Sequence, residues 1–108
     1  MMITEFVKVA AVADLPANGM IAVQIEKEEI MIARVGDEYF ALDGWCSHAA
    51  GLLEEGYLHA EEFEVECPVH EGFFNLRTGE AVVPPPENPV KVYGVRIEGD
   101  DILIGPKD

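Results

Sequence analysis

The sequence predicts an all-β fold. Apolar and polar residues alternate with period two over 20–26 and 29–35, so that every second side chain shares one face. No long stretch repeats apolar residues with the 3.6-residue period of a helix. Turn-forming pairs such as Gly36-Asp37 and Gly99-Asp100 separate the short apolar segments. These patterns together predict a framework of antiparallel strands in a β-sandwich.

The elements follow in chain order from the same patterns. The pair Lys27-Glu28 has the length of a hairpin turn, and one helical turn near 12–15 is the most helix that we expect. Arg77-Thr78-Gly79 predicts a further turn. The expected strands are 4–9, 20–26, 29–35, 38–43, 62–66, 73–76, 90–97 (which Gly94 can interrupt) and 101–104.

The region from 44 to 84 differs from the rest of the chain in its sequence pattern. Strand patterns thin out there, and five glycines punctuate it. It ends at Pro84-Pro85-Pro86, a stiff segment that cannot join a central strand. We interpret 44–84 as a small subdomain inserted into the β framework of a single domain, 1–108, which is large enough for one core.

Charge and composition exclude several classes of function. Seven basic against 21 acidic residues give a net charge of −14, so nucleic acid and anionic membranes would be repelled. No apolar run approaches the roughly 20 residues that span a bilayer, and the N-terminus shows no secretory signal. A cytoplasmic protein without membrane contact is expected. The acidic surface is either a solvated shell or a docking face for a basic partner. Its candidate rim is Glu54, Glu55, Glu61, Glu62, Glu64 and Glu66.

Two short segments predict a metal centre. Cys46-Ser47-His48 and Cys67-Pro68-Val69-His70 contain both cysteines of the chain and two of its three histidines. Thiolate and imidazole suit zinc or an iron–sulfur cluster. Zinc fingers pair cysteine with cysteine and histidine with histidine, whereas each segment here mixes the two. The mixed pattern favours two irons, one held by both cysteines and one by both histidines, which makes 44–84 the expected cluster-binding subdomain. A non-redox zinc module remains the alternative. No catalytic constellation is visible, so the chain should not act as an enzyme.

These residues resemble the Rieske iron–sulfur signature, C-x-H followed by C-x-x-H. Residues 46–56 resemble the first cluster loop of that family, and residues 66–79 resemble the second loop with its return hairpin. The prolines at 84–86 match a third, covering loop. Among Rieske proteins, the chain is most similar to the small ferredoxins that feed bacterial aromatic-ring dioxygenases.

The resemblance implies a one-electron carrier with one [2Fe-2S] cluster. Cys46 and Cys67 would hold the inner iron, and His48 and His70 the outer iron. An NAD(P)H-dependent flavoprotein reductase would donate the electron, a terminal Rieske oxygenase would accept it, and the carrier would be a monomer. A Rieske subunit of another cytoplasmic oxidoreductase, such as a nitrite reductase, is the alternative within the family.

The chain departs from the high-potential Rieske proteins at three positions. Gly51 and Val69 stand where those relatives carry a second, disulfide-bonded cysteine pair, and Gly72 stands where they place a serine hydroxyl. Fewer hydrogen bonds to sulfur predict a low potential for this class, roughly −150 mV. Glu71, where glycine is common, should lower the potential further.

Four residues near the predicted ligands have expected structural roles. Trp45 should be a core anchor rather than an electron relay, and His59 should have a surface or capping role. Phe73 and Phe74 should pack the subdomain onto the sheet.

Overall fold

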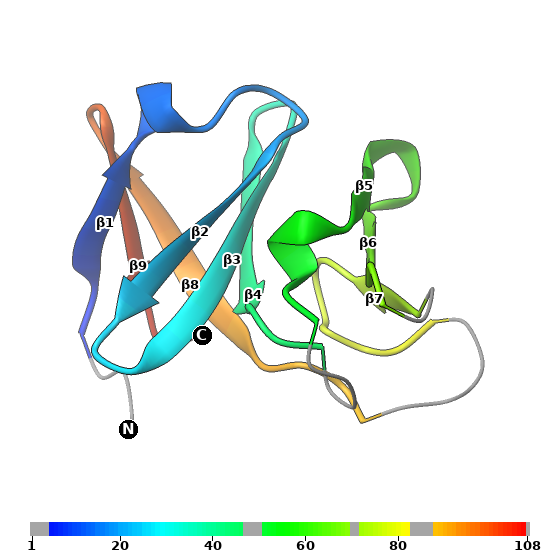
Figure 1. Ribbon diagram of the computed structural model, residues 1–108. Helices are drawn as coiled ribbons and strands as arrows, with labels where there is room; N and C mark the ends of the chain where they lie inside the picture. Colours follow the sequence, from blue (N-terminus) through cyan, green and yellow to red (C-terminus); the bar gives the residue numbers. More distant parts are fainter. Residues whose placement is uncertain (1–4, 47–50, 70–71, 83–87, 108) are drawn as a thin grey trace.

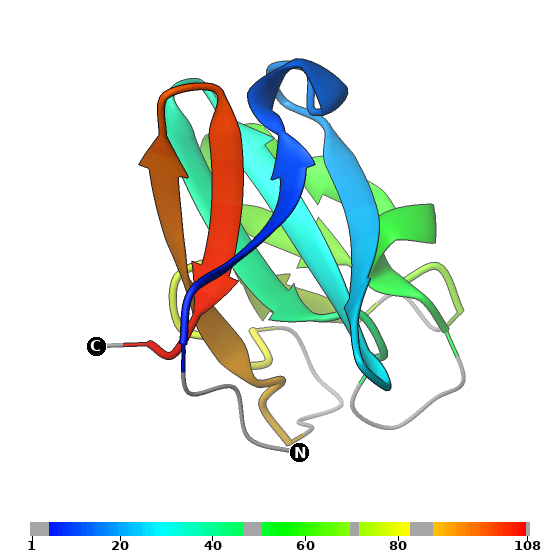
Figure 2. The same ribbon diagram turned by 90° about the vertical axis from the view of Figure 1, so that its left-hand side faces the viewer.

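A computed structural model describes residues 5–46, 51–69, 72–82 and 88–107 of the chain. Within them, six strands form one antiparallel sheet and three form another. The larger sheet contains β1 (Val7–Ala11), β2 (Met20–Ile25), β3 (Glu28–Val35), β4 (Glu38–Asp43), β8 (Val92–Glu98) and β9 (Asp101–Gly105), in the order β1-β9-β8-β4-β3-β2. The smaller contains β5 (Tyr57–His59), β6 (Glu64–Glu66) and β7 (Phe73–Asn75), in that order. Figure 1 shows the two sheets side by side, and Figure 2 shows the larger one in front of the smaller.

The strand predictions are confirmed in kind and corrected at several ends. The β2–β3 hairpin turns at Glu26-Lys27, one residue before the expected pair, and Glu26 adopts a positive φ of 54° there. Strand β8 runs through Gly94 without a break. Strand β5 was not expected, because its three residues are too few for a period to be visible. The proline segment 84–86 lies outside the described residues.

Short 3₁₀ helices connect the strands. The expected helical turn is η1 (Val12–Asp14), and two more, η2 (Leu53–Glu55) and η3 (Ala60–Glu62), flank β5 in the smaller subdomain. Among the described residues, no helix has the length and apolar character needed to cross a membrane.

Strand β3 separates two hydrophobic cores. Its residues 30–33 are completely buried on both faces, whereas antiparallel strands commonly expose one face to water. Ile30 and Ile32 pack into the core of the larger sheet with Leu15, Ala41, Tyr93, Ile102 and Ile104. Met31 and Ala33 face the other way, into a core shared with the smaller subdomain. The period-two alternation of a strand therefore assigns one pair of side chains to each core.

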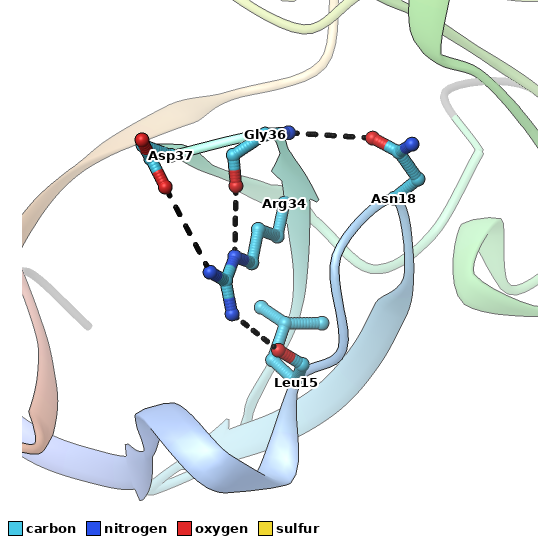
Figure 3. Close-up of polar contacts among 5 residues, drawn as sticks. All are labelled: Leu15, Asn18, Arg34, Gly36 and Asp37. Atoms are coloured by element: carbon cyan, nitrogen blue, oxygen red, sulfur yellow. Dashed lines mark hydrogen bonds and ion pairs between the residues drawn. The ribbon is translucent and has the colours of Figure 1, made fainter.

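Arg34, at the end of β3, fastens the turn before β2 to the β3–β4 turn. Its Nε donates to the backbone oxygen of Gly36 (2.9 Å), and its Nη1 donates to the backbone oxygen of Leu15 (3.1 Å). The Asn18 side-chain oxygen accepts from the Gly36 N–H at 3.3 Å, and Asp37 lies 4.0 Å from Nη2 (Figure 3). The guanidinium also lies 5.2 Å from the Tyr39 ring centroid. Two chain segments distant in sequence, 15–18 and 34–39, thus meet around one side chain.

A second arginine joins the two sheets. The Arg77 guanidinium lies 3.8 Å from the Phe63 ring centroid and 5.7 Å from that of Phe40. Phe63 adopts a left-handed backbone, with φ 55° and ψ 50°. That conformation costs on the order of 1 kcal/mol or more for a residue other than glycine. The aromatic packing between Phe63 and Phe40, with ring centroids 5.8 Å apart, offsets part of the cost.

Candidate metal centre

Two loops of the smaller subdomain begin at the two cysteines and close in the same way. The Cys46 N–H donates to the carbonyl of Gly51 at 2.9 Å, and the Cys67 N–H donates to the carbonyl of Gly72 at 2.7 Å. In each case the bond spans five residues and closes the loop at its base. The repeated pattern fixes both cysteines at equivalent positions, one at the start of each loop.

Short β pairings hold these loop bases. Around the first loop, Trp45 pairs with Leu52, and the Leu53 N–H donates to the Gly44 carbonyl at 2.7 Å. Around the second loop, Glu66 on β6 is paired with Phe73 on β7. Because each cysteine directly follows a paired residue, its backbone is fixed before the loop begins.

The loops touch each other at a glycine. A Cβ atom placed on Gly51 would lie 3.4 Å from Cys67 Sγ and only 2.5 Å from Val69 Cγ2. The second value is shorter than real Cβ contacts, so a side chain at position 51 would push the loops apart. Glycine therefore permits the end of the first loop to approach the thiol of the second.

Both thiols lie in the interior. Cys46 is 5% exposed and Cys67 is 1% exposed, and both belong to the core shared with β3. Neither forms a disulfide. Buried sulfur ligands at the base of each loop suit a soft metal, and thiolate sulfur is the ligand that iron–sulfur clusters use. The two cysteine thiols therefore fit one half of the predicted cluster site.

The two predicted histidine ligands, His48 and His70, lie outside the described residues. Each belongs to the loop whose base is fixed by a cysteine, two residues after Cys46 and three after Cys67. Across 5–46, 51–69, 72–82 and 88–107, no group of three or more His, Cys, Asp or Glu side chains gathers as a metal site. This is expected when half of the ligand set is outside those ranges.

The third histidine has a defined partner. His59 Nε2 lies 2.8 Å from Glu66 Oε1, and its ring centroid is 5.0 Å from that of Phe73. Glu66 directly precedes Cys67. The expected surface role of His59 is thus specific: it contacts the strand that leads into the second loop. Sequence reasoning missed this pair because β5, which carries His59, was not predicted.

The expectation for Trp45 was wrong, and those for the phenylalanines need refinement. Trp45 is 48% exposed, because the pairing with Leu52 leaves its side chain at the surface beside the first loop. Phe74 is buried in the shared core, as expected, whereas Phe73 is half-buried against His59.

One acidic side chain near the loops is poorly accommodated. The Oε1 atom of Glu54 on η2 is buried without a hydrogen-bond partner. Burial raises the pKa of this carboxyl above its ordinary value, and the charges of Glu55 and Glu29 raise it further. The folded protein therefore favours the carboxylate form of Glu54 less than the unfolded chain does.

The loop geometry has a counterpart in known proteins. The Rieske [2Fe-2S] domain family matches residues 5–94. This chain belongs to the Rieske [2Fe-2S] family. The match covers both cysteine loops and the framework on either side of them, which confirms the all-β Rieske fold and a [2Fe-2S] cofactor.

Three Rieske relatives define the position of the chain within the family. It is 39% identical over 100 residues to the biphenyl dioxygenase ferredoxin subunit of Pseudomonas sp. (strain KKS102), covering 92% of this chain and 90% of the relative. The ferredoxin of carbazole 1,9a-dioxygenase from Nocardioides aromaticivorans IC177 is 38% identical, with a TM-score of 0.90 over 96% of this chain and all of that one. A ferredoxin complexed with its oxygenase in carbazole 1,9a-dioxygenase is 28% identical, with a TM-score of 0.85 over 95% of each chain.

These relatives distinguish between the three functions that the sequence left open: a dioxygenase ferredoxin, a nitrite reductase subunit and a zinc module. The chain is an electron-carrying ferredoxin of the type that serves aromatic-ring dioxygenase systems, and not a catalytic component. A putative nitrite reductase small subunit from Mycobacterium tuberculosis is only 17% identical, with a TM-score of 0.84, and shares the fold alone. A non-redox zinc module does not agree with the family.

Proposed function

We propose that Cys46, His48, Cys67 and His70 hold the [2Fe-2S] cluster of this ferredoxin, the cysteines on the inner iron and the histidines on the outer one. The observation that supports this most is the shared loop closure, Cys46 to Gly51 and Cys67 to Gly72, with both thiols buried. A bound cluster supplies reversible one-electron chemistry. The protein side chains orient it and exclude water from its sulfur-ligated half.

An NAD(P)H-dependent flavoprotein reductase donates the electron and a terminal Rieske oxygenase accepts it. The relative whose structure is solved in complex with an oxygenase supports an acceptor of this kind. Exposed apolar side chains support docking near the loops. Four of the six large ones among the described residues lie within 44–84, namely Trp45, Tyr57, Val69 and Val82. These four residues belong to the segment that contains both cysteine loops, where a partner would approach the cluster.

Charge supports the same docking face. The segment 44–84 contains eight acidic residues and one basic residue, Arg77, which gives a net charge of 1 − 8 = −7 in 41 of the 108 residues. Basic partners would be attracted to this half of the molecule, and salt would screen the attraction. The rate of cluster reduction by the reductase should therefore fall as ionic strength rises, whereas a rate unchanged by salt would contradict acidic docking.

The ligand assignment is tested by metal content and spectroscopy of purified variants. Cys46→Ser, Cys67→Ser, His48→Gln and His70→Gln should each lose iron, acid-labile sulfide and the low-average-g EPR signal of the reduced protein. His59→Gln is the matched control, since it removes the remaining histidine and should keep the cluster. A wild-type protein with one zinc and no sulfide would refute the proposal, as would a full cluster in any of the four ligand variants.

The ferredoxin acts as a monomeric single domain in the cytoplasm. Cysteines that are not joined in a disulfide support a reducing compartment. The high negative charge opposes self-association. Light scattering of the holoprotein as it elutes from a size-exclusion column should give the chain mass of about 11.9 kDa, and twice that value would contradict the monomer.

A further inference from the structure

A pocket of about 400 Å³ opens where β4 and β8 separate. The two strands pair only at Leu42 opposite Val92 and at Ala41 opposite Tyr93. Continued with the same register, Tyr39 would lie opposite Val95, but the ladder has already ended. Figure 1 shows the two strands close at one end and spread apart toward the other. Tyr39 and Val95 line the pocket that fills this wedge.

The backbone of β4 presents a donor to this pocket. The Asp43 N–H donates to the Lys91 carbonyl at 2.9 Å, so the odd-numbered residues of β4 direct their backbone polar groups toward β8. Hydrogen-bonding direction alternates along an antiparallel strand. Tyr39 is two positions beyond Ala41, on the same side as Asp43. Its N–H therefore points into the wedge.

The backbone of β8 presents a second donor by the same rule. A two-residue turn, Gly99-Asp100, joins β8 to β9, and Glu98 opposes Asp101 at its base. The residues that close such a turn are hydrogen-bonded to each other, so Glu98 and Arg96 direct their polar groups to β9. Val95 directs its own away from β9, toward β4. By this rule, the N–H and the carbonyl of Tyr39 and of Val95 are directed toward the pocket from facing strands.

Two cationic side chains complete the pocket. Arg77 and Lys107 line it, and the Lys107 ammonium donates to the Arg77 carbonyl at 3.3 Å. Arg77 is half-exposed, stacks on Phe63 and lies 3.6 Å from the Glu38 carboxylate. A guanidinium has five N–H donors and an ammonium three, so both retain donors after these contacts. The remaining walls are mostly aliphatic and aromatic.

We propose that this wedge binds a small carboxylic acid with a flat apolar body, of the size of benzoate. The carboxylate would accept from Arg77, Lys107 and the N–H groups of Tyr39 and Val95, and the body would contact the apolar walls. The volume falls at the small end of the range for ligand pockets, about 300–1,000 Å³. The site lies outside the ligand loops, so it does not depend on the proposed cluster ligands.

Titration of the oxidised holoprotein with benzoate, followed by ¹H–¹⁵N NMR, tests the proposal. We expect saturable shifts at the amides of Tyr39 and Val95, with a Kd on the order of 1 mM for a ligand this small. Benzamide, which lacks the charge, and acetate, which lacks the apolar body, should each bind about tenfold more weakly at matched ionic strength. Equal affinity for benzoate and benzamide, or the absence of saturable shifts with benzoate, would overturn the proposal.

Variants at the rim separate a specific site from a general effect of salt. Lys107→Gln should weaken benzoate binding about threefold, since an exposed cation contributes modestly. Lys8→Gln is the matched control, because Lys8 pairs with Asp101 at 3.1 Å on β9 and does not line the pocket. Arg77→Gln should weaken binding more, but it also removes the stacking on Phe63. The test therefore rests on Lys107→Gln, and an unchanged Kd in this variant would refute the contribution of Lys107 to carboxylate binding.

Discussion

A disulfide between positions 51 and 69 should form in the double variant Gly51→Cys/Val69→Cys. A Cβ on Gly51 would lie 3.3 Å from Val69 Cβ, slightly below the 3.5–4.5 Å or so that disulfides span. The close contact with Val69 Cγ2, 2.5 Å, disappears in the double variant because that methyl group is absent. A movement of a few tenths of an ångström then brings the two Cβ atoms into range.

The expected stabilisation follows from the loop that the bridge closes. Positions 51 and 69 are 69 − 51 = 18 residues apart. A cross-link over about 18 residues removes chain entropy worth about 3 kcal/mol from the unfolded state. At about 4–8 °C per kcal/mol for a domain near this size, the oxidised variant should unfold at least 10 °C higher than its reduced form.

Peptide mapping and thermal unfolding of the holoprotein, oxidised and reduced, measure the two effects. The single variant Gly51→Ala is the informative control. It adds the Cβ but keeps Val69 Cγ2, so it should lose about 2 kcal/mol of stability and part of its cluster content. The reasoning would be refuted if the new cysteines stayed unpaired, if one of them paired with Cys67, or if Gly51→Ala behaved as wild type.

Three further predictions concern the framework and the acidic carboxyl. Glu54→Gln should raise the free energy of unfolding at pH 7.5 by about 0.5 kcal/mol after solvent screening, which is measured as a higher melting temperature. Since the folded pKa is raised, wild-type stability falls as pH rises above about 4.5, so the gain should vanish below that pH; a gain that persists at pH 3.5 would contradict it. Arg34→Met should lower the free energy of unfolding, measured by denaturant titration, by about 1.5 kcal/mol, because two hydrogen bonds from a charged group are lost. An unchanged free energy would show that these two hydrogen bonds do not stabilise the fold. Tyr93→Phe removes the hydroxyl that donates to Asp43 at 3.2 Å and should cost about 1 kcal/mol by the same assay, whereas a stabilised variant would contradict this bond's contribution.

The strands of the framework could be predicted where a period was long enough to be seen. β2, β3 and β4 have six, eight and six residues, and alternation shows clearly over such lengths. β5 has three residues, and its pairing with β6 comes from chain contacts that no local pattern records. For the same reason, the exposure of Trp45 was misjudged: an aromatic side chain favours burial in general, but the bridge to Leu52 decides its direction.

The sequence by itself determined which donors the chain offers to a metal centre, because residue type and spacing are properties of the chain: two Cys–His pairs offer soft and imidazole donors whatever their surroundings. Only the tertiary structure decided how the two loops meet. The contact of Gly51 with Cys67 and Val69, the two cores on either side of β3, and the wedge between β4 and β8 all join segments distant in sequence. Such contacts depend on packing and strand register, which local patterns do not contain.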